Sequence, residues 1–396
     1  MQLYLNPNAT PRADYGPALE AILERAGHEA AWDEIRTWPG YRPTPLLELE
    51  QLARDLGLAR LWYKDEAHRF HLESFKALGG AYAVLRVLQD EIRRRGGDGD
   101  LSSQALRRGD HAALAASLTV TSATDGNHGR SVAWGAEMFG CPCVIYIHEG
   151  VSQGREAAIA RFGAEVRRVP GSYDDSVRQA ALDAQANGWH VVSDTSYEGY
   201  DAVPRQVMQG YTVMAAEAAA ALPADTVPSH LFIQGGVGGL AAAVTAHFWQ
   251  RWGGGRPRVV VVEPVRADCL YQSAMAGRPA HATGDLETVM AGLSCGEIST
   301  IVWPILAEGA AAFMTIPDEA AIEAMRRLAE DEAVVGGESG VAGLAGLIAA
   351  AGDPASAEAL GLDANARVLL VGSEGATDPE LYRKLVGRAP EDVRGA

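Results

Sequence analysis

The stretch HLFIQGGVGGLAAAV, residues 230–244, indicates how this chain is built. Residues 230–234 form a mostly apolar run of strand length, and the small apolar residues after the glycines are typical of a helix that begins near residue 238. Four glycines lie within positions 235–239, at the turn between the two. Glycines at a helix N-terminus let backbone N–H groups close around a phosphate, and the helix dipole favours the anion. The stretch therefore predicts a βα unit with an anion-binding turn.

Strand-like and helix-like segments alternate on both sides of this unit. Further strands are expected at 58–64, 117–123, 143–148, 165–169, 189–193, 258–263 and 367–372, and helices at about 128–139, 151–162 and 174–187. This alternation is typical of parallel sheets covered by helices. We therefore predict an α/β protein with two open, twisted parallel-sheet domains and the active site in a cleft between them. The larger domain is predicted at 1–87 plus 198–396, and the smaller at 88–197.

Composition and charge exclude several classes of function. Of 396 residues, 47% are apolar, and 51 acidic against 34 basic side chains give a net charge of −17. So acidic a chain, without a long basic block, is a poor partner for nucleic acid or an anionic membrane. The N-terminus lacks the basic start and apolar run of a signal peptide, and no apolar run reaches the length of a membrane span. We expect a cytoplasmic protein that acts on a small molecule.

The four cysteines predict no metal site. Cys141 and Cys143 lie in a strand-like segment, as buried thiols do, without a second pair or a histidine at zinc spacing. Cys269 and Cys295 lie in loop-like stretches, and the sequence leaves open whether they pair.

A lysine at the start of an amphipathic helix is the first candidate for chemistry. In ESFKALGGAYAVLRVLQD, residues 73–90, apolar residues recur at helical spacing from Ala81 onward, and Lys76 stands just before them. A lysine there can reach water with its end while its stem is buried. Gly79 and Gly80, however, weaken a helix and indicate a close backbone approach. A desolvated lysine is also what Schiff-base chemistry requires.

Polar residues follow several of the expected strands. SATDGNHG (122–129), VSDTSYEGYD (192–201) and VGSEGATDP (371–379) all begin at a strand end. Ligands of open α/β sheets bind at the carboxyl ends of the strands. An ordinary helix-capping turn also explains Asp125-Gly126-Asn127. The convergence of these loops with Lys76 makes a binding site the stronger interpretation.

A second interpretation comes from the glycine turn alone. Gly236, Gly238 and Ala241 match G-x-G-x-x-A, and Glu263 ends the next strand, as in a dinucleotide fingerprint. This pattern predicts a nicotinamide-dependent oxidoreductase. It leaves Lys76 and the 122–129 segment without a role.

Six segments taken together resemble the fold-type II pyridoxal-phosphate enzymes, the group of tryptophan synthase β and threonine dehydratase. They are RPTPL (42–46), KDE (64–66), SFKALGGAYA (74–83), SATDGNHG (122–129), GGVGG (235–239) and SEGATDP (373–379). Within the group, Asp125 and the stretches DTSYEGY (194–200), AGLSCGE (291–297) and GGESGVAG (336–343) resemble the diaminopropionate ammonia-lyases. The resemblance covers about residues 40–385 and implies pyridoxal 5'-phosphate as cofactor and a homodimer.

The resemblance also implies roles for single residues. Lys76 would bind the cofactor's aldehyde covalently and act as a base once freed, and Asn127 would contact the ring hydroxyl. Ser373 would hydrogen-bond the pyridine nitrogen; a neutral hydroxyl leaves that nitrogen unprotonated, which favours elimination over transamination. The phosphate would be held by Gly235, Gly236, Val237, Gly238 and Gly239. The substrate would contact Thr124, Asp125, His128, Asp194 and Tyr197.

Asp125 adds a prediction of its own. Hydroxy-amino-acid dehydratases of the group usually have Ser or Ala just before Gly-Asn-His, and a carboxylate is a better base than a serine at neutral pH. With Lys76 and Asp125 on opposite faces of the cofactor, Cα protons of both stereochemistries could be removed. Asp194 could pair with the substrate's β-ammonium or assist its departure.

The predicted reaction is α,β-elimination of ammonia from D- and L-2,3-diaminopropionate. Its product, aminoacrylate, hydrolyses to pyruvate and a second ammonia. Two alternatives within the group stay open: a dehydratase of serine, threonine or 3-hydroxyaspartate, and a synthase that adds a nucleophile to aminoacrylate.

Overall fold

The computed structural model describes residues 1–10, 13–124 and 126–395. Internal contacts divide the chain into two compact units. The first unit comprises residues 1–25, 43–74 and 214–396, and the second unit comprises 26–42 and 75–213. The domain boundary expected after residue 87 falls inside helix α4 (Lys76–Arg94), and all of this helix lies in the second unit. The domain limits as such stay a prediction.

A seven-stranded sheet forms the centre of the first unit. Its order is β1 (Gln2–Leu5), β10 (Ala310–Ile316), β9 (Arg258–Pro264), β8 (His230–Gln234), β11 (Arg367–Gly372), β3 (Arg60–Asp65) and β2 (Leu46–Glu48). The five inner strands run parallel, which confirms the α/β prediction. The two outer strands, β1 and β2, pair antiparallel with their neighbours and were not expected from the sequence.

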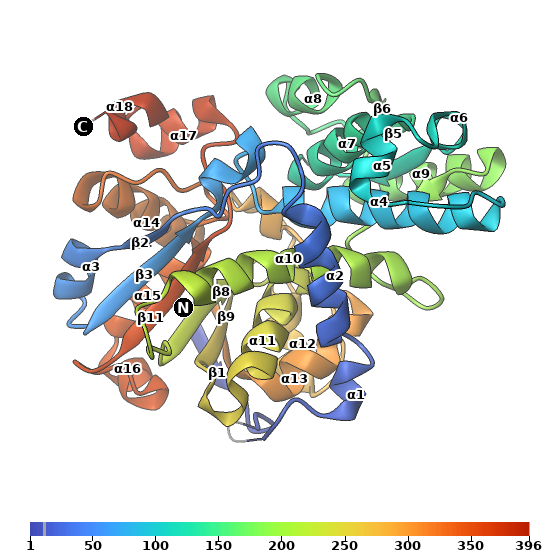
Figure 1. The fold of residues 1–396 in the computed structure, drawn as a ribbon. Helices are drawn as coiled ribbons and strands as arrows, with labels where there is room; N and C mark the ends of the chain where they lie inside the picture. The colour runs from blue at the N-terminus through green and yellow to red at the C-terminus, as the bar shows by residue number, and fades with distance from the viewer. Residues whose placement is uncertain (11–12, 125, 396) are drawn as a thin grey trace. The chain divides into compact units, whose positions relative to one another are not determined.

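Helices cover both faces of this sheet. Helices α11 (Gly239–Trp252), α12 (Cys269–Ala276) and α13 (Trp303–Gly309) connect β8 to β9 and β9 to β10, whereas α14 (Asp318–Asp331), α15 (Ala342–Ala351) and α16 (Pro354–Leu360) lead from β10 back to β11. The two groups cross the strand order in opposite directions, so right-handed connections put them on opposite faces, as Figure 1 shows. The core lies under α15, where Phe232, Val262 and Leu370 are buried.

The remaining elements of the first unit are short. They are α1 (Pro17–Glu20), α3 (Glu50–Asp55), α17 (Pro379–Val386), α18 (Pro390–Arg394) and the 3₁₀ turns η1 (Glu66–His71), η2 (Gly253–Gly255), η3 (Ala291–Leu293) and η4 (Thr300–Val302). The long helix α10 (Ala202–Ala221) spans the boundary between residues 213 and 214. Within the described part of the chain, no helix is both long and apolar enough to cross a bilayer.

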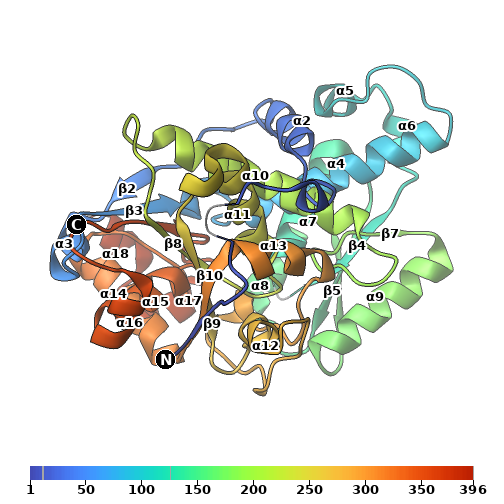
Figure 2. The same cartoon turned by 90° about the horizontal axis from the view of Figure 1, so that it is seen from below.

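The second unit contains a four-stranded parallel sheet. Its order is β6 (Glu165–Val169), β5 (Cys143–His148), β4 (Val120–Ala123) and β7 (His190–Val191). Its helices are α2 (Arg25–Ile35), α4, α5 (Ser103–Arg108), α6 (Ala112–Ala115), α7 (Asn127–Phe139), α8 (Gln153–Ala160) and α9 (Tyr173–Asn187). Helix α9 packs on β4 and β5 (Figure 2). The strands and helices predicted in this region are confirmed, although β4 and β7 are shorter than the expected 117–123 and 189–193.

The stretch at 93–110 is polar and rich in glycine. It contains α5, because Ser102 Oγ accepts a hydrogen bond from Ala105 N at 3.2 Å and so caps the helix. Ala105 and Leu106 are buried, so a short apolar face outweighs the polar composition of the segment.

Candidate active site

Lys76 is the first residue of α4, as the sequence predicts. Its side chain is only 19% exposed, and its Nζ donates a hydrogen bond to Asp194 Oδ2. Nζ also lies 5.4 Å from the centroid of the Phe75 ring and 5.8 Å from that of Tyr211. The Asp194 carboxylate and the faces of two aromatic rings therefore lie around the ammonium. This surrounding holds a charged lysine in place while excluding most water.

The two glycines after Lys76 allow close packing, which explains their position. A Cβ at Gly79 would overlap the Tyr211 ring, and one at Gly80 would lie 2.5 Å from Ser131 Oγ. Ser131 Oγ donates to the Lys76 carbonyl at 2.6 Å and accepts from Ala81 N at 3.1 Å. The first turn of α4 is thus fixed by a side chain from α7. Fixing that turn also fixes where the lysine side chain begins.

Asp194 interacts with a histidine as well as with Lys76. His128 Nδ1 lies 3.8 Å from Asp194 Oδ2, and His128 Nε2 lies 2.9 Å from the carbonyl oxygen of Val192. Burial opposes ionisation of Asp194, but the charge of Lys76 and the hydrogen bond from Lys76 outweigh it and hold the pKa of Asp194 well below its usual range. Asp194 is therefore a carboxylate at neutral pH.

The loop before α7 presents an amide in one orientation. Thr124 Oγ1 accepts hydrogen bonds from Gly126 N at 3.0 Å and Gly129 N at 3.1 Å, which fixes the turn. A guanidinium can only donate, so Arg130, whose NH2 lies 3.2 Å from Asn127 Oδ1, leaves the Asn127 Nδ2 as a donor. Asp125 lies outside the described residues.

Among the described residues predicted for the site in this unit, Tyr197 is the most exposed. The ring of Tyr197 is stacked on that of Tyr200, with ring centroids 5.0 Å apart and ring planes inclined by 14°. Tyr197 is 55% exposed. Its proposed contact with substrate stays a prediction.

The glycine turn of the first unit has the geometry of an anion cradle. Gly236 and Gly238 have φ of +68° and +94°, values that favour glycine. A Cβ at Gly238 would lie 2.7 Å from Val302 Cγ2, so a residue with a side chain would not fit at this position. Gly239 opens α11, a helix of 14 residues whose first N–H groups have no intrahelical partner. Backbone donors and the helix dipole both favour a phosphate here.

Glu263, the acid of the possible dinucleotide fingerprint, is buried and hydrogen-bonded to the backbone of the protein itself. It is 1% exposed, and its two oxygens accept from Leu270 N at 3.1 Å and Tyr271 N at 2.8 Å. Burial raises its pKa to about 8, against the two backbone hydrogen bonds. A buried carboxyl bonded to backbone cannot hold a ribose hydroxyl, so the structure disfavours the oxidoreductase interpretation.

Ser373 has its hydroxyl oriented by a glutamine. Gln234 Nε2 donates to Ser373 Oγ at 2.7 Å and to the Val371 carbonyl at 2.9 Å. Because Ser373 Oγ accepts this bond, its own O–H remains to donate. Ser373 is 3% exposed and follows the last residue of β11. A donor hydroxyl suits an unprotonated pyridine nitrogen.

These residues fit pyridoxal phosphate. The cofactor has an aldehyde, a ring hydroxyl, a pyridine nitrogen and a phosphate. The second unit offers the Lys76 amine and the Asn127 Nδ2, and the first unit offers the N-terminus of α11 and the Ser373 hydroxyl. Each chemical group thus has a side chain or backbone donor of the matching kind.

Sequence reasoning did not find the residues that orient this chemistry. Gln234 is the last residue of β8, and a polar side chain in a buried strand was the signal that could have found it. Arg130 lies one helical turn after Asn127, a spacing that permits contact. Tyr211 and Ser131 gave no signal, because each approaches Lys76 from a distant segment.

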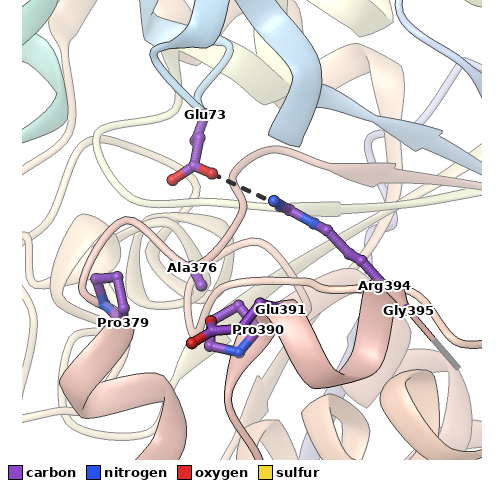
Figure 3. A pocket seen from close by; sticks show the side chains of 7 residues that line it. All are labelled: Glu73, Ala376, Pro379, Pro390, Glu391, Arg394 and Gly395. Carbon is purple, nitrogen blue, oxygen red and sulfur yellow. Dashed lines mark ion pairs between the residues drawn. The ribbon is translucent and has the colours of Figure 1, made fainter.

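One open pocket, of about 460 Å³, lies near the end of the chain in the first unit (Figure 3). Pro379, Pro390 and Arg394 line it, and Arg394 NH2 is 3.6 Å from Glu73 Oε1. None of the predicted site residues lines it, so it is not assigned to the candidate site. It borders a backbone link, because Gly375 N donates to Glu73 O at 2.9 Å.

The comparisons with known proteins first define the class. The family model described as "Pyridoxal-phosphate dependent enzyme" matches residues 37–374, so the chain belongs to that family. This confirms the cofactor and the fold-type II prediction.

The relatives then define the particular family. The chain is 39% identical over 392 residues to the diaminopropionate ammonia-lyase of Salmonella typhimurium, covering 95% of this chain and 96% of the relative. It is 39% identical over 355 residues to that of Escherichia coli, covering 88% of both. The chain is therefore a member of the diaminopropionate ammonia-lyase family.

Solved structures agree with this assignment. Diaminopropionate ammonia-lyase from Escherichia coli in complex with D-serine aligns with a TM-score of 0.88 at 35% identity, over 97% of this chain and 96% of that one. The same enzyme with an aminoacrylate–pyridoxal phosphate azomethine reaction intermediate aligns with a TM-score of 0.86, at the same identity and coverage. A tomato threonine deaminase, 19% identical with a TM-score of 0.74, shares the fold.

Proposed function

We propose that this enzyme eliminates ammonia from D- and L-2,3-diaminopropionate, giving pyruvate and two molecules of ammonia. The observation that carries the proposal is the pairing of Lys76 Nζ with the Asp194 carboxylate. The names of the relatives support the same reaction.

Lys76 and Asp194 have complementary tasks in this proposal. Pyridoxal phosphate would supply the electron sink that makes the Cα proton of the substrate removable. Asp194 would lose its ammonium partner if Lys76 held the cofactor. Its carboxylate, ionised at neutral pH, is then available to accept a hydrogen bond from the β-ammonium of the substrate. Once freed by substrate, Nζ removes the Cα proton on its own face.

Asp125 is proposed as the base on the opposite face, from its residue type and the resemblance. Replacing Asp125 with Asn is expected to lower turnover of one enantiomer by about 100-fold, since positioned acid–base groups contribute 10²–10⁴. The other enantiomer should lose less than about threefold, because Lys76 serves it. Separate assays of D- and L-diaminopropionate measure both. Equal losses on the two substrates would refute the two-face assignment.

Dehydration is the second candidate reaction. The Escherichia coli relative has been crystallised with D-serine, and relatives at 26% identity over 332 residues are named threonine dehydratases. An ionised Asp194 favours a cationic β-substituent over a hydroxyl. We therefore expect higher kcat/KM on diaminopropionate than on serine, threonine or 3-hydroxyaspartate, measured as pyruvate or other oxo-acid release. The reverse ranking favours the dehydratase.

The assembly and location also remain proposals. We propose a homodimer, as the resemblance to enzymes of this group implies, and a cytoplasmic location, as the sequence analysis expects. A sedimentation velocity run on the purified enzyme tests the dimer, and cell fractionation tests the location.

A further inference from the structure

Both ring nitrogens of the buried His128 imidazole lie close to one short segment of the chain. His128 is 7% exposed, its Nε2 is 2.9 Å from the Val192 carbonyl, and its Nδ1 is 3.8 Å from Asp194 Oδ2. Val192 and Asp194 are two residues apart, just after β7. One ring therefore spans from the backbone of this segment to its carboxylate.

The hydrogen bonding fixes which nitrogen carries the ring proton. A carbonyl oxygen only accepts, so Nε2 is the donor to Val192. Burial lowers the pKa of His128, and the charge of Lys76 lowers it further. The charge of Asp194 and the hydrogen bond to the Val192 carbonyl act in the opposite direction. The neutral ring therefore has a bare Nδ1. Among the described residues, Nδ1 has no hydrogen-bond partner.

We propose that His128 Nδ1 accepts the proton that Lys76 gains from the substrate. The proton passes from Lys76 to Nδ1 by way of the Asp194 carboxylate. The proposal rests on the proposed elimination and adds a step to it. Lys76 must be neutral again before it can rebind the cofactor's aldehyde, so its extra proton needs a destination. In this proposal His128 receives the proton by way of Asp194 and passes it to the departing ammonia.

The proton path balances. The N–H bond of the Lys76 ammonium breaks and the proton passes to Asp194 Oδ2, from which a proton forms a new N–H bond at His128 Nδ1. Lys76 becomes neutral, Asp194 ends as a carboxylate, and His128 becomes imidazolium. The ring then gives this proton to a departing ammonia, which leaves as ammonium. The Nδ1–Oδ2 separation of 3.8 Å must shorten by about 1 Å for the transfer.

A glutamine substitution separates this role from a structural one. His128→Gln keeps a side-chain N–H for the Val192 carbonyl but has no basic nitrogen. We expect an unchanged visible absorption band of bound cofactor, a KM within about twofold, and a kcat lower by roughly 10–100-fold. The acid limb of the kcat–pH profile caused by His128 protonation should disappear.

The matched control is His111→Gln in the same unit. His111 Nε2 likewise lies 3.0 Å from a backbone carbonyl, that of Asp100. The His111→Gln variant should leave both kcat and the kcat–pH profile unchanged. A His128→Gln enzyme that keeps full kcat and its acid limb overturns the proposal.

A measurement on the unaltered chain decides the case if the variant does not fold. ¹⁵N–¹H correlation spectra of histidine-labelled holoenzyme report the tautomer directly. A proton on Nε2 and a bare Nδ1 at neutral pH support the proposal, and a proton on Nδ1 overturns it. Failure of the proposed function looks different: the unaltered enzyme would release no pyruvate from diaminopropionate, whatever the tautomer of His128.

Discussion

At the scale of single residues, the candidate site depends on side chains that orient other side chains. Arg130 fixes the Asn127 amide, Gln234 fixes the Ser373 hydroxyl, and Val192 fixes the His128 ring. In each case a group that can only donate or only accept determines the direction of its neighbour. Preorganised donors of this kind cost no reorganisation when a ligand binds.

The Arg130 contact predicts a loss of cofactor affinity. Replacing Arg130 with Met removes its hydrogen bond to the Asn127 amide, so we expect the Kd for pyridoxal phosphate to rise roughly tenfold, equivalent to about 1.4 kcal/mol. Arg130→Lys keeps a donor and should lose less. Titration of the cofactor-free enzyme, followed by absorbance, measures both. Equal affinities for the unaltered and Met enzymes would contradict the role.

Glu263 predicts a pH dependence of stability. Its pKa is about 8 in the folded protein against an ordinary 4.5, so the folded state binds the proton more tightly. The contribution to stability is complete below about pH 4.5 and is lost as the pH rises toward 8. Glu263→Gln does not titrate, so its urea midpoint should fall less between pH 5 and pH 8 than that of the unaltered protein. Parallel curves for the two proteins would contradict the assignment.

At the scale of elements, glycines set how closely helices approach in the second unit. A Cβ at Gly135 of α7 would lie 2.7 Å from Ala81 Cα of α4, a backbone atom that cannot rotate away. The two helices would have to separate, and the Ser131 contact with the first turn of α4 would weaken with them.

Gly135→Ala is therefore expected to lower the free energy of unfolding by about 1–3 kcal/mol, the usual cost of overpacking. Gly154→Ala is the control, because Gly154 is exposed in α8. A Cβ added there would lie 3.9 Å from Ser152 Oγ, which is an ordinary contact distance. That variant should be neutral or slightly stabilising. Urea unfolding of both variants makes the comparison, and similar losses in the two would show that helix contact is not the cause.

At the scale of the whole molecule, one buried ionic network joins distant segments of the first unit. Lys64 Nζ donates to Glu217 Oε2 at 2.7 Å, and Arg69 donates to Glu217 and to Glu66 at 2.6–2.9 Å. All four side chains are at most 1% exposed. Strand β3, turn η1 and helix α10 meet in this network. The two positive and two negative charges balance.

Glu217→Gln leaves the two cations with one carboxylate. We expect a loss of about 3–5 kcal/mol in the free energy of unfolding, because an uncompensated buried charge is costly. Arg54→Ala, which breaks the exposed pair between Arg54 and Glu50, is the control and should change stability by less than about 0.5 kcal/mol. Chemical denaturation tests both. A loss for Glu217→Gln as small as that of the control would mean that water compensates the network.

Local pattern was enough to predict the inner elements and the chemistry of their ends. Strands β5, β6, β8 and β11 begin and end where the sequence places them, and Lys76 opens its helix as expected. Hydrophobic periodicity and glycine turns report on neighbours along the chain, and these neighbours determine where a strand or helix begins. The resemblance supplied the cofactor on the same local segments.

Tertiary structure alone decided what lies beside what. The order β10-β9-β8-β11-β3 does not follow the chain, and the edge strand β1 pairs with a strand three hundred residues later. Lys76 meets Asp194 across 118 positions, and His128, Arg130 and Gln234 acquire their orienting contacts only in the folded units. A sequence records which groups are available, whereas the hydrogen each one donates or accepts depends on the partner that packing brings to it.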